Sequence, residues 1–354
     1  MERFDVIIAG AGAAGMMCAI EAGKRGRRVL VVDHARAPGE KIRISGGGRC
    51  NFTNIGTEPK NFLGQNPKFC VSALRRYTPR DFIALVEKHR IAWHEKTLGQ
   101  LFCDDSAKQI VRMLLDEMKA AGVELRLETA IDRVAKTDAG FEVAMGGRAA
   151  ACESFVVATG GKSIPKMGAT GWAYDVARQF GLPVVDTRPG LVPLTFEIGL
   201  LERLKPLAGV AVDARVTAGN GKSGCAFDEA MLFTHRGLSG PAILQASSYW
   251  REGEAIEVDM APGTDVLAAL KQARRETPKR ALPTVLHQWL PDRLAHHVAA
   301  EAGAQGNIAD ASDKVLAAAA SLTNAWRVKP VGSEGYRTAE VTLGGVDWQP
   351  WNAR

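Results

Sequence analysis

Three glycines near the N-terminus, Gly10, Gly12 and Gly15, constrain the fold of this chain more than any other feature. They follow an apolar stretch at 4–9 that is typical of a buried strand, and they lead into a helical stretch at 16–24. Gly10 permits a tight turn, Gly12 lets the backbone approach a pyrophosphate at the helix N-terminus, and Gly15 permits close packing of helix against strand. The sequence therefore predicts a βαβ unit that binds a dinucleotide.

The next predicted strand, at 28–33, ends in an acidic residue, Asp33, which lies about 20 residues beyond the glycines. A carboxylate at this point can accept hydrogen bonds from a ribose hydroxyl and disfavours a 2′-phosphate, so we expect FAD or NAD. Ala13 and Ala14, between Gly12 and Gly15, complete the expected binding turn. The motif alone does not choose between the two cofactors.

A glycine-rich stretch at 41–54 favours FAD. It breaks helical and strand periodicity, so we predict a loop, and it holds more bare backbone and small polar donors than a connection to a helix needs. Such a loop could lie against a flavin and its phosphates, with successive amides forming an anion-binding nest, and a flexible surface loop is the alternative. The cofactor-binding residues expected here are Lys41, Arg43, Ser45, Gly46, Gly47, Gly48, Arg49, Cys50 and Asn51.

Cys50 has two interpretations. The charge of Arg49 beside it could lower the pKa of its thiol. Because the sequence offers no Cys-x-x-Cys partner, we do not expect a redox-active disulfide. We therefore favour burial of Cys50 as a small residue.

The charge of the chain is only mildly basic, with a net value of +6 and an isoelectric point near 9.0. Lys41, Arg43 and Arg49 lie in an acid-free stretch at 41–57 that would suit a polyphosphate. No long basic run or aromatic–basic alternation indicates a nucleic-acid groove. A solvated basic surface is therefore favoured over nucleic-acid binding.

The location of the protein is expected to be cytoplasmic. The uncharged run at 6–20 is shorter than the roughly 20 residues of a membrane helix, and Glu2 and Asp5 stand where a signal peptide carries positive charge. The six cysteines show no paired spacing that would indicate a metal site or a disulfide framework. We expect neither a metal nor a membrane contact.

The rest of the chain changes character twice. A buried-type strand at 155–158 runs into Thr159 and Gly160. After Pro189, short β-type stretches separated by turn residues indicate a small antiparallel domain. Residues 264–325 are alanine-rich and helical, which indicates a helical insertion.

Five segments together resemble a known family of flavoproteins, the NAD(P)/FAD-dependent oxidoreductases, which includes bile-acid 3-dehydro-Δ4,6-reductase-like proteins and members labelled aminoacetone oxidase. The resemblance covers nearly the whole chain. The segments at 41–54 and 232–247 are specific to the family, whereas those at 6–15 and 158–174 recur across many flavoenzymes. The fifth segment lies at 339–346.

The resemblance implies an α/β fold in which a Rossmann-like FAD-binding domain (1–189 and 338–354) carries an inserted β-barrel-like substrate domain (190–263 and 326–337) and a helical subdomain (264–325). It implies that Gly10, Gly12, Gly15 and Asp33 hold the adenosine-diphosphate half of FAD. The loop at 43–54 would approach the isoalloxazine, and Thr159 and Gly160 would close on the cofactor. The motif at 232–245 would shape the substrate side.

The chain departs from the family after Val346, where it reads DWQPWNAR in place of the family's flavin-covering segment. We expect a truncated or frame-shifted end. The adenosine-diphosphate site would survive, and the flavin ring would be held less tightly.

The function expected is that of an FAD-dependent oxidoreductase that passes hydride from NAD(P)H through the flavin to an unidentified small organic substrate. His235, on the substrate side, could orient a carbonyl, supply a proton or fix its own loop, and we slightly favour the last role. No catalytic acid or base, substrate identity or oligomeric state is predicted. The alternatives are a truncated, catalytically impaired dinucleotide-binding protein, an NAD-only dehydrogenase, and a flavoprotein acting on RNA.

Overall fold

The computed structural model describes residues 1–64, 66–219 and 224–347. Residues 348–354, which carry most of the expected departure from the family, lie outside the described residues. The chain forms two units, Met1–Asp186 with Gly344–Arg354, and Thr187–Leu343. Two strands, β10 (Val184–Gly190) and β18 (Val341–Val346), pair in a sheet of their own where the chain passes between the units.

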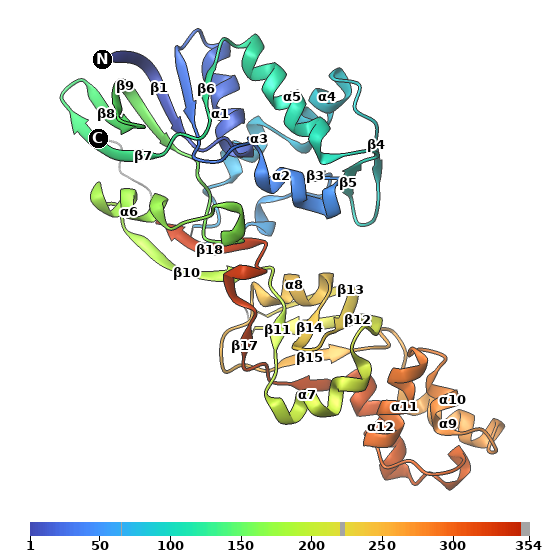
Figure 1. The fold of residues 1–354 in the computed structure, drawn as a ribbon. Coiled ribbons are helices and arrows are strands. Elements are labelled where there is room, and N and C mark those ends of the chain that lie inside the picture. The colour runs from blue at the N-terminus through green and yellow to red at the C-terminus, as the bar shows by residue number, and fades with distance from the viewer. Residues whose placement is uncertain (65, 220–223, 348–354) are drawn as a thin grey trace. The chain divides into compact units, whose positions relative to one another are not determined.

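The first unit is built on a six-stranded sheet with the order β6-β2-β1-β9-β8-β7 (Figure 1). Strands β6, β2, β1 and β9 run parallel to one another, and β8 and β7 add antiparallel neighbours at one edge. The bounds are Glu2–Ala9 (β1), Val29–Val32 (β2), Glu124–Arg126 (β6), Ile131–Thr137 (β7), Gly140–Met145 (β8) and Arg148–Val157 (β9).

The apolar run of β1 is explained by burial on both faces of this sheet. Ile7 and Ile8 point to opposite faces and neither is exposed. Ile8 belongs to a core with α1 (Ala13–Lys24) and α5 (Ala107–Ala120), whereas Ile7 belongs to a core with strands β7 to β9. The fold class expected from the sequence, a Rossmann-like domain of mixed α/β content, is confirmed.

The remaining elements of this unit are short, and most of them lie between β2 and α5 in the sequence. Strands β3, β5 and β4 form a small antiparallel sheet. The bounds are Glu40–Ile44 (α2), Ser45–Gly48 (η1), Asn51–Asn54 (β3), Pro59–Asn61 (η2), Val71–Arg76 (α3), Pro79–Lys88 (α4), Trp93–Glu95 (β4), Gln100–Cys103 (β5), Pro165–Met167 (η3) and Trp172–Gln179 (α6).

The second unit contains a seven-stranded antiparallel sheet with the order β16-β15-β12-β13-β14-β11-β17. The strands are Leu194–Thr195 (β11), Ala211–Ala218 (β12), Cys225–Phe233 (β13), Gly237–Ser239 (β14), Ile256–Asp259 (β15), Trp326–Val328 (β16) and Gly332–Ser333 (β17). The helices are Ile198–Leu204 (α7), Lys205–Leu207 (η4), Pro241–Ser247 (α8), Val266–Glu276 (α9), Leu282–Leu286 (α10), Asp292–Glu301 (α11), Ile308–Asp310 (η6), Asp313–Asn324 (α12) and Gly335–Arg337 (η7).

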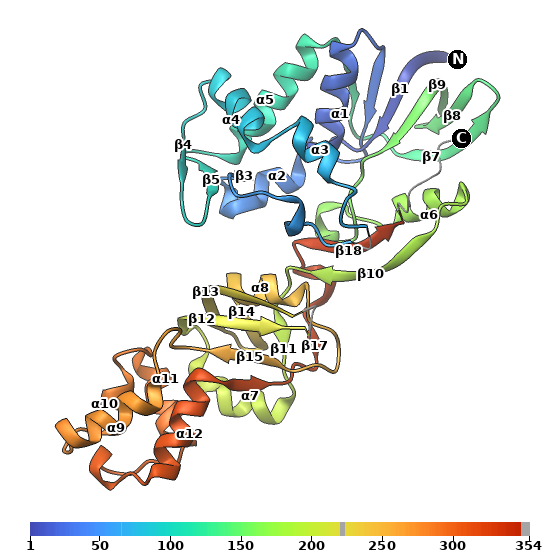
Figure 2. The same ribbon diagram turned by 180° about the vertical axis from the view of Figure 1, so that it is seen from behind.

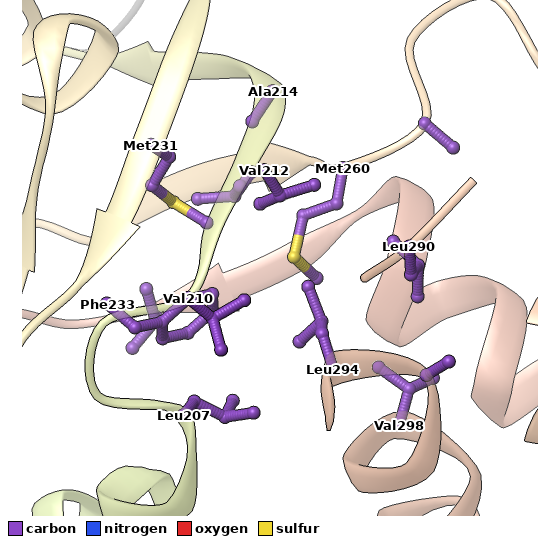
Figure 3. Packing of buried hydrophobic residues seen from close by; sticks show 14 of the residues in the cluster. Leu207, Val210, Val212, Ala214, Met231, Phe233, Met260, Leu290, Leu294 and Val298 are labelled. Atoms are coloured by element: carbon purple, nitrogen blue, oxygen red, sulfur yellow. The ribbon is translucent and has the colours of Figure 1, made fainter. Parts of the chain in front are cut away.

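One hydrophobic core joins this sheet to its helices. Figure 3 shows Met231 and Phe233 of β13 and Met260, beyond β15, packed in the same cluster as Leu294 and Val298 of α11. Burial of these side chains in one cluster stabilises sheet and helices together. The division of this unit into a β-barrel-like domain and a helical insertion stays a prediction.

A buried carboxylate ties three helices of the first unit together. Glu117 of α5 exposes 7% of its side chain and binds Lys88 Nζ at 2.6 Å, His89 Nε2 at 2.9 Å and Lys24 Nζ at 3.3 Å. The hydrogen bonds from Lys88 and His89 lower the pKa of Glu117 from 4.5 to about 2. The ionised carboxylate therefore stabilises the packing of α1, α4 and α5.

We expect Glu117→Gln to lower the free energy of unfolding at neutral pH by about 2 kcal/mol. Because the folded-state pKa lies below the ordinary value, the contribution of Glu117 is present above pH 4.5 and is lost as the pH falls toward about 2. Urea unfolding between pH 2 and 7 measures it. The control is Glu87→Gln on α4, an exposed position, and identical unfolding curves for the two variants would contradict the assignment.

Candidate cofactor-binding site

A cavity of about 690 Å³ opens in the first unit where β1, β2 and β9 reach their carboxyl ends. In open α/β sheets this edge is where ligands bind, and the volume lies within the range of ligand pockets. Eight of the predicted cofactor-binding residues line it. They are Gly10, Gly12, Ala13, Ala14, Asp33, Lys41, Thr159 and Gly160.

The three glycines of the motif divide into two structural roles. Gly10 has a φ of 106°, and a Cβ there would lie 2.6 Å from the carbonyl oxygen of Ala158. A Cβ at Gly15 would lie 1.9 Å from the carbonyl oxygen of Gly10. These two positions therefore set the packing of strand, turn and helix.

Gly12 has the third role. It is the N-cap of α1, and a Cβ there would meet no heavy atom within 4 Å. Gly12, Ala13 and Ala14 line the cavity, and the first turn of a helix carries backbone N–H groups that have no partner within the helix. This end of α1 is therefore suited to an anionic group.

Asp33 stands beside the glycine turn and holds it. Its carboxylate accepts a hydrogen bond from the backbone N–H of Ala11 at 2.7 Å through Oδ2 and another from Ala35 at 2.9 Å through Oδ1. The side chain is 16% exposed and lines the cavity. Each carboxylate oxygen has more than one acceptor position, so Asp33 retains capacity for a ribose hydroxyl.

A positive charge lines the same cavity. Lys41 of α2 donates from Nζ to Ser163 Oγ at 2.9 Å, and burial lowers the pKa of Lys41. Within the described ranges this ammonium forms no ion pair. A half-buried cation without a carboxylate partner is suited to a phosphate.

The opposite wall of the cavity follows β9. Thr159 and Gly160 begin the turn after this strand, as expected, and a Cβ at Gly160 would meet no heavy atom within 4 Å. The wall continues through Met167 to Thr170 and Trp172. The Trp172 ring packs edge-on against Phe155 at a centroid distance of 6.4 Å, which ties this wall to the sheet.

The prediction of a loop at 41–54 was wrong in part. Residues 40–44 form α2, residues 45–48 form the turn η1, and residues 51–54 form β3. Gly46, Gly47 and Gly48 have φ values of 57°, 67° and 87°, and a Cβ at Gly46 would lie 2.6 Å from the Phe102 ring. The glycines are therefore needed for the left-handed turn between two regular elements.

Several residues expected at the cofactor lie outside the lining of this cavity. Arg43 donates from Nε to the carbonyl oxygen of Pro38 at 3.1 Å. Gly15 packs against Gly10 at the end of β1, and the others lie in η1, in the two residues after it and at the start of β3. Those that do not line it are Gly15, Arg43, Ser45, Gly46, Gly47, Gly48, Arg49, Cys50 and Asn51.

Cys50 is buried with 5% exposure, as expected for a small core residue. Burial raises the pKa of its thiol, against the lowering considered for a neighbour of Arg49. Burial likewise raises the pKa of Cys103, with which Cys50 interacts, to about 11. Both thiols are therefore protonated at neutral pH.

His235 is an exposed residue of the second unit, in the turn between β13 and β14. In the described part of the chain no hydrogen bond or ion pair fixes it. Thr234 holds this turn, because its Oγ1 accepts hydrogen bonds from the backbone N–H groups of Arg236 at 3.2 Å and Gly237 at 3.1 Å. The favoured role of His235, fixing its own loop, gains no support from these contacts and stays a prediction.

Sequence reasoning missed part of the cavity wall. His34 and Ala35 follow Asp33 directly, and the segment at 167–170 belongs to a recognised motif, so both carried a signal. A Cβ at Gly168 would lie 2.6 Å from His34 Nε2, so these two walls are in contact. Residues 129–131 show no pattern in the sequence that indicates a binding site, because only the pairing of strands distant in the chain brings them to the cavity.

Two searches of the described residues gave negative results. No group of three or more His, Cys, Asp and Glu side chains there could hold a metal ion. No helix in those ranges has both the length and the apolar character needed to cross a membrane.

Comparisons with known proteins assign the chain to a family. The ribosomal RNA dihydrouridine synthase of Escherichia coli is 53% identical over 360 residues, covering 100% of this chain and 88% of that protein. The protein of the same name from Haemophilus influenzae is 43% identical over 346 residues, covering 96% and 85%. The 3-dehydro-bile acid delta(4,6)-reductase of Clostridium scindens is 26% identical over 258 residues, covering 72% and 61%.

The family model described as the HI0933-like protein Rossmann domain matches residues 4–354. This match extends over nearly the whole chain and begins in β1, the strand that leads into the glycine turn. The chain belongs to the HI0933-like protein family.

Proposed function

We propose that this protein is an FAD-dependent enzyme that reduces uridine to dihydrouridine in ribosomal RNA, with NAD(P)H as the reductant. The observation that carries the proposal is the 53% identity, over 100% of the chain, to a protein named ribosomal RNA dihydrouridine synthase. The cavity at the sheet edge supports it, because a two-electron reduction of this kind needs a redox cofactor.

The cavity fits a dinucleotide. Positions 12 and 160 leave open space beside the backbone, which a bound group can occupy. The amides at the start of α1 would hold the pyrophosphate, Asp33 would bind the ribose of the adenosine half, and Lys41 would neutralise phosphate charge. Bound FAD would supply the capacity to take a hydride from NAD(P)H and to transfer it to an acceptor.

The reaction saturates the C5–C6 double bond of the uracil ring. One of these carbons receives the hydride that NAD(P)H provides, the other receives a proton, and NAD(P)⁺ is released. The name of the Clostridium relative, a delta(4,6)-reductase, denotes reduction of a double-bond system as well. The chain's own task is to bind and orient the cofactor and to exclude water from it.

We propose RNA, and not a small organic molecule, as the substrate. The modest charge of the whole chain favours a small molecule and leaves RNA as the alternative. The names of the two relatives with 53% and 43% identity favour the alternative.

We expect the purified protein to show flavin absorbance, and to convert uridine to dihydrouridine in ribosomal RNA from a strain that lacks its own synthase. Mass spectrometry of the digested nucleosides detects the gain of two hydrogens, with NADH and NADPH supplied separately. RNA incubated without either reductant is the control. A colourless protein that FAD does not reconstitute, or a flavoprotein that leaves this RNA unchanged, would refute the proposal.

We expect Gly12→Ala and Gly15→Ala to have different effects. Gly12→Ala places a methyl group in the open space at the start of α1, so the protein stays folded and its FAD affinity falls at least about tenfold. Gly15→Ala drives a methyl group into the Gly10 carbonyl and lowers the free energy of unfolding by about 3 kcal/mol. Flavin titration and thermal unfolding separate the two effects, and unchanged FAD affinity in Gly12→Ala would disprove the pyrophosphate placement.

A further inference from the structure

The positive charge of this chain is concentrated in one segment, residues 41–80. The segment holds eight lysines and arginines and one acidic residue, Glu58, which gives a net charge of +7 against +6 for the whole chain. The remainder of the chain is therefore close to neutral. A basic surface this concentrated is typical of proteins that bind nucleic acids.

Most of these cations are available to a ligand. Arg49, Lys68, Arg75, Arg76 and Arg80 are all exposed. In the part of the chain that the structure describes, none of the five forms an ion pair. Cations that are not neutralised by the protein's own carboxylates attract phosphates most strongly.

The same segment exposes apolar and aromatic side chains. It contains six of the twelve large hydrophobic residues that are exposed among the described residues, with Phe62 at 47% and Tyr77 at 39%. Aromatic faces beside cations are the means by which proteins hold unpaired nucleotides, through base stacking and phosphate contacts. The six residues are Ile44, Ile55, Phe62, Leu63, Phe69 and Tyr77.

The segment is held by its own contacts and begins at the cofactor cavity. Strand β3 pairs with β5, and the Cys70 thiol donates to the carbonyl oxygen of Pro59 at 3.8 Å, which joins η2 to the start of α3. Figure 2 shows α3 on the side of the first unit that faces the viewer. Lys41 and Ile42, at the start of the segment, line the cavity.

We propose that the described residues of segment 41–80 form the surface on which the protein binds unpaired nucleotides of its RNA substrate. This inference rests on the proposed function, and it assigns the RNA to a segment whose first residues, Lys41 and Ile42, line the cofactor cavity. An anionic membrane would also attract basic and apolar side chains. The helical elements here are too short for that binding mode, since α3 has six residues and η2 has three.

Fluorescence anisotropy of a labelled single-stranded oligouridylate of about 20 nucleotides, measured over a range of salt concentrations, tests the surface. The triple variant Arg75→Gln, Arg76→Gln, Arg80→Gln is expected to lower affinity at least about tenfold and to reduce the salt slope by about 2. Phe62→Ala is expected to lower affinity about tenfold without changing the slope. Thermal unfolding and flavin absorbance of each variant confirm that the fold and the cofactor site are intact.

The matched control replaces three exposed cations of the same unit that lie outside the segment and, within the described ranges, form no ion pair: Arg27→Gln, Lys119→Gln and Lys136→Gln. It removes the same charge and is expected to change affinity less than about twofold. If it weakens binding as much as the triple variant does, the attraction is a property of net charge and the surface is wrong.

The remaining outcomes separate this inference from the proposed function. If ribosomal RNA is reduced and the Arg75, Arg76 and Arg80 variant binds and reduces it like the unaltered protein, the surface is wrong and the function stands. If the protein binds the oligonucleotide through these arginines but reduces no ribosomal RNA, the surface stands and the function fails. Binding to anionic phosphatidylglycerol vesicles in place of the oligonucleotide would overturn the RNA assignment.

Discussion

The contact between the backbone of α1 and the end of β1 is the constraint on which the first unit depends. A Cβ at Gly15 would lie 1.9 Å from the Gly10 carbonyl oxygen, so only glycine permits this approach. Because helix and strand meet so closely, the first turn of α1 lies at the sheet edge where β2 and β9 also end. Several separate stretches of chain converge there on one cavity, and the glycine spacing places the start of α1 in its wall.

The sequence predicted those parts of the site whose positions are fixed by residues nearby in the chain. The strand at 4–9, the glycine turn, the helix after it and Asp33 lie within one βαβ unit, where spacing along the chain fixes spacing in space. The glycine-rich stretch at 41–54 was predicted less well. Its glycines serve the left-handed turn η1, and the five-residue helix α2 before it is too short to show a periodicity.

The parts that sequence reasoning missed depend on distant segments. Residues 129–131 reach the cavity because they follow β6, which pairs with β2, and the backbone N–H of Thr129 donates to the carbonyl oxygen of Asp33 at 3.0 Å. No local pattern in the sequence indicates that pairing. No local pattern predicts the ion pairs of Glu117 either, because its partners come from two other helices. The net charge of the whole chain also conceals the basic segment, because 40 consecutive residues carry all of the excess.

The double hydrogen bonding of Asp33 has a consequence for attempts to change cofactor preference. An acidic residue at the end of the second strand disfavours a 2′-phosphate, so replacing it is the direct way to admit one. In this protein the same carboxylate holds the amides of Ala11 and Ala35, so its removal leaves two backbone donors without their acceptor and loosens both sides of the cavity mouth. A substitution of Asp33 would therefore change the order of the glycine turn as well as the proposed ribose contact.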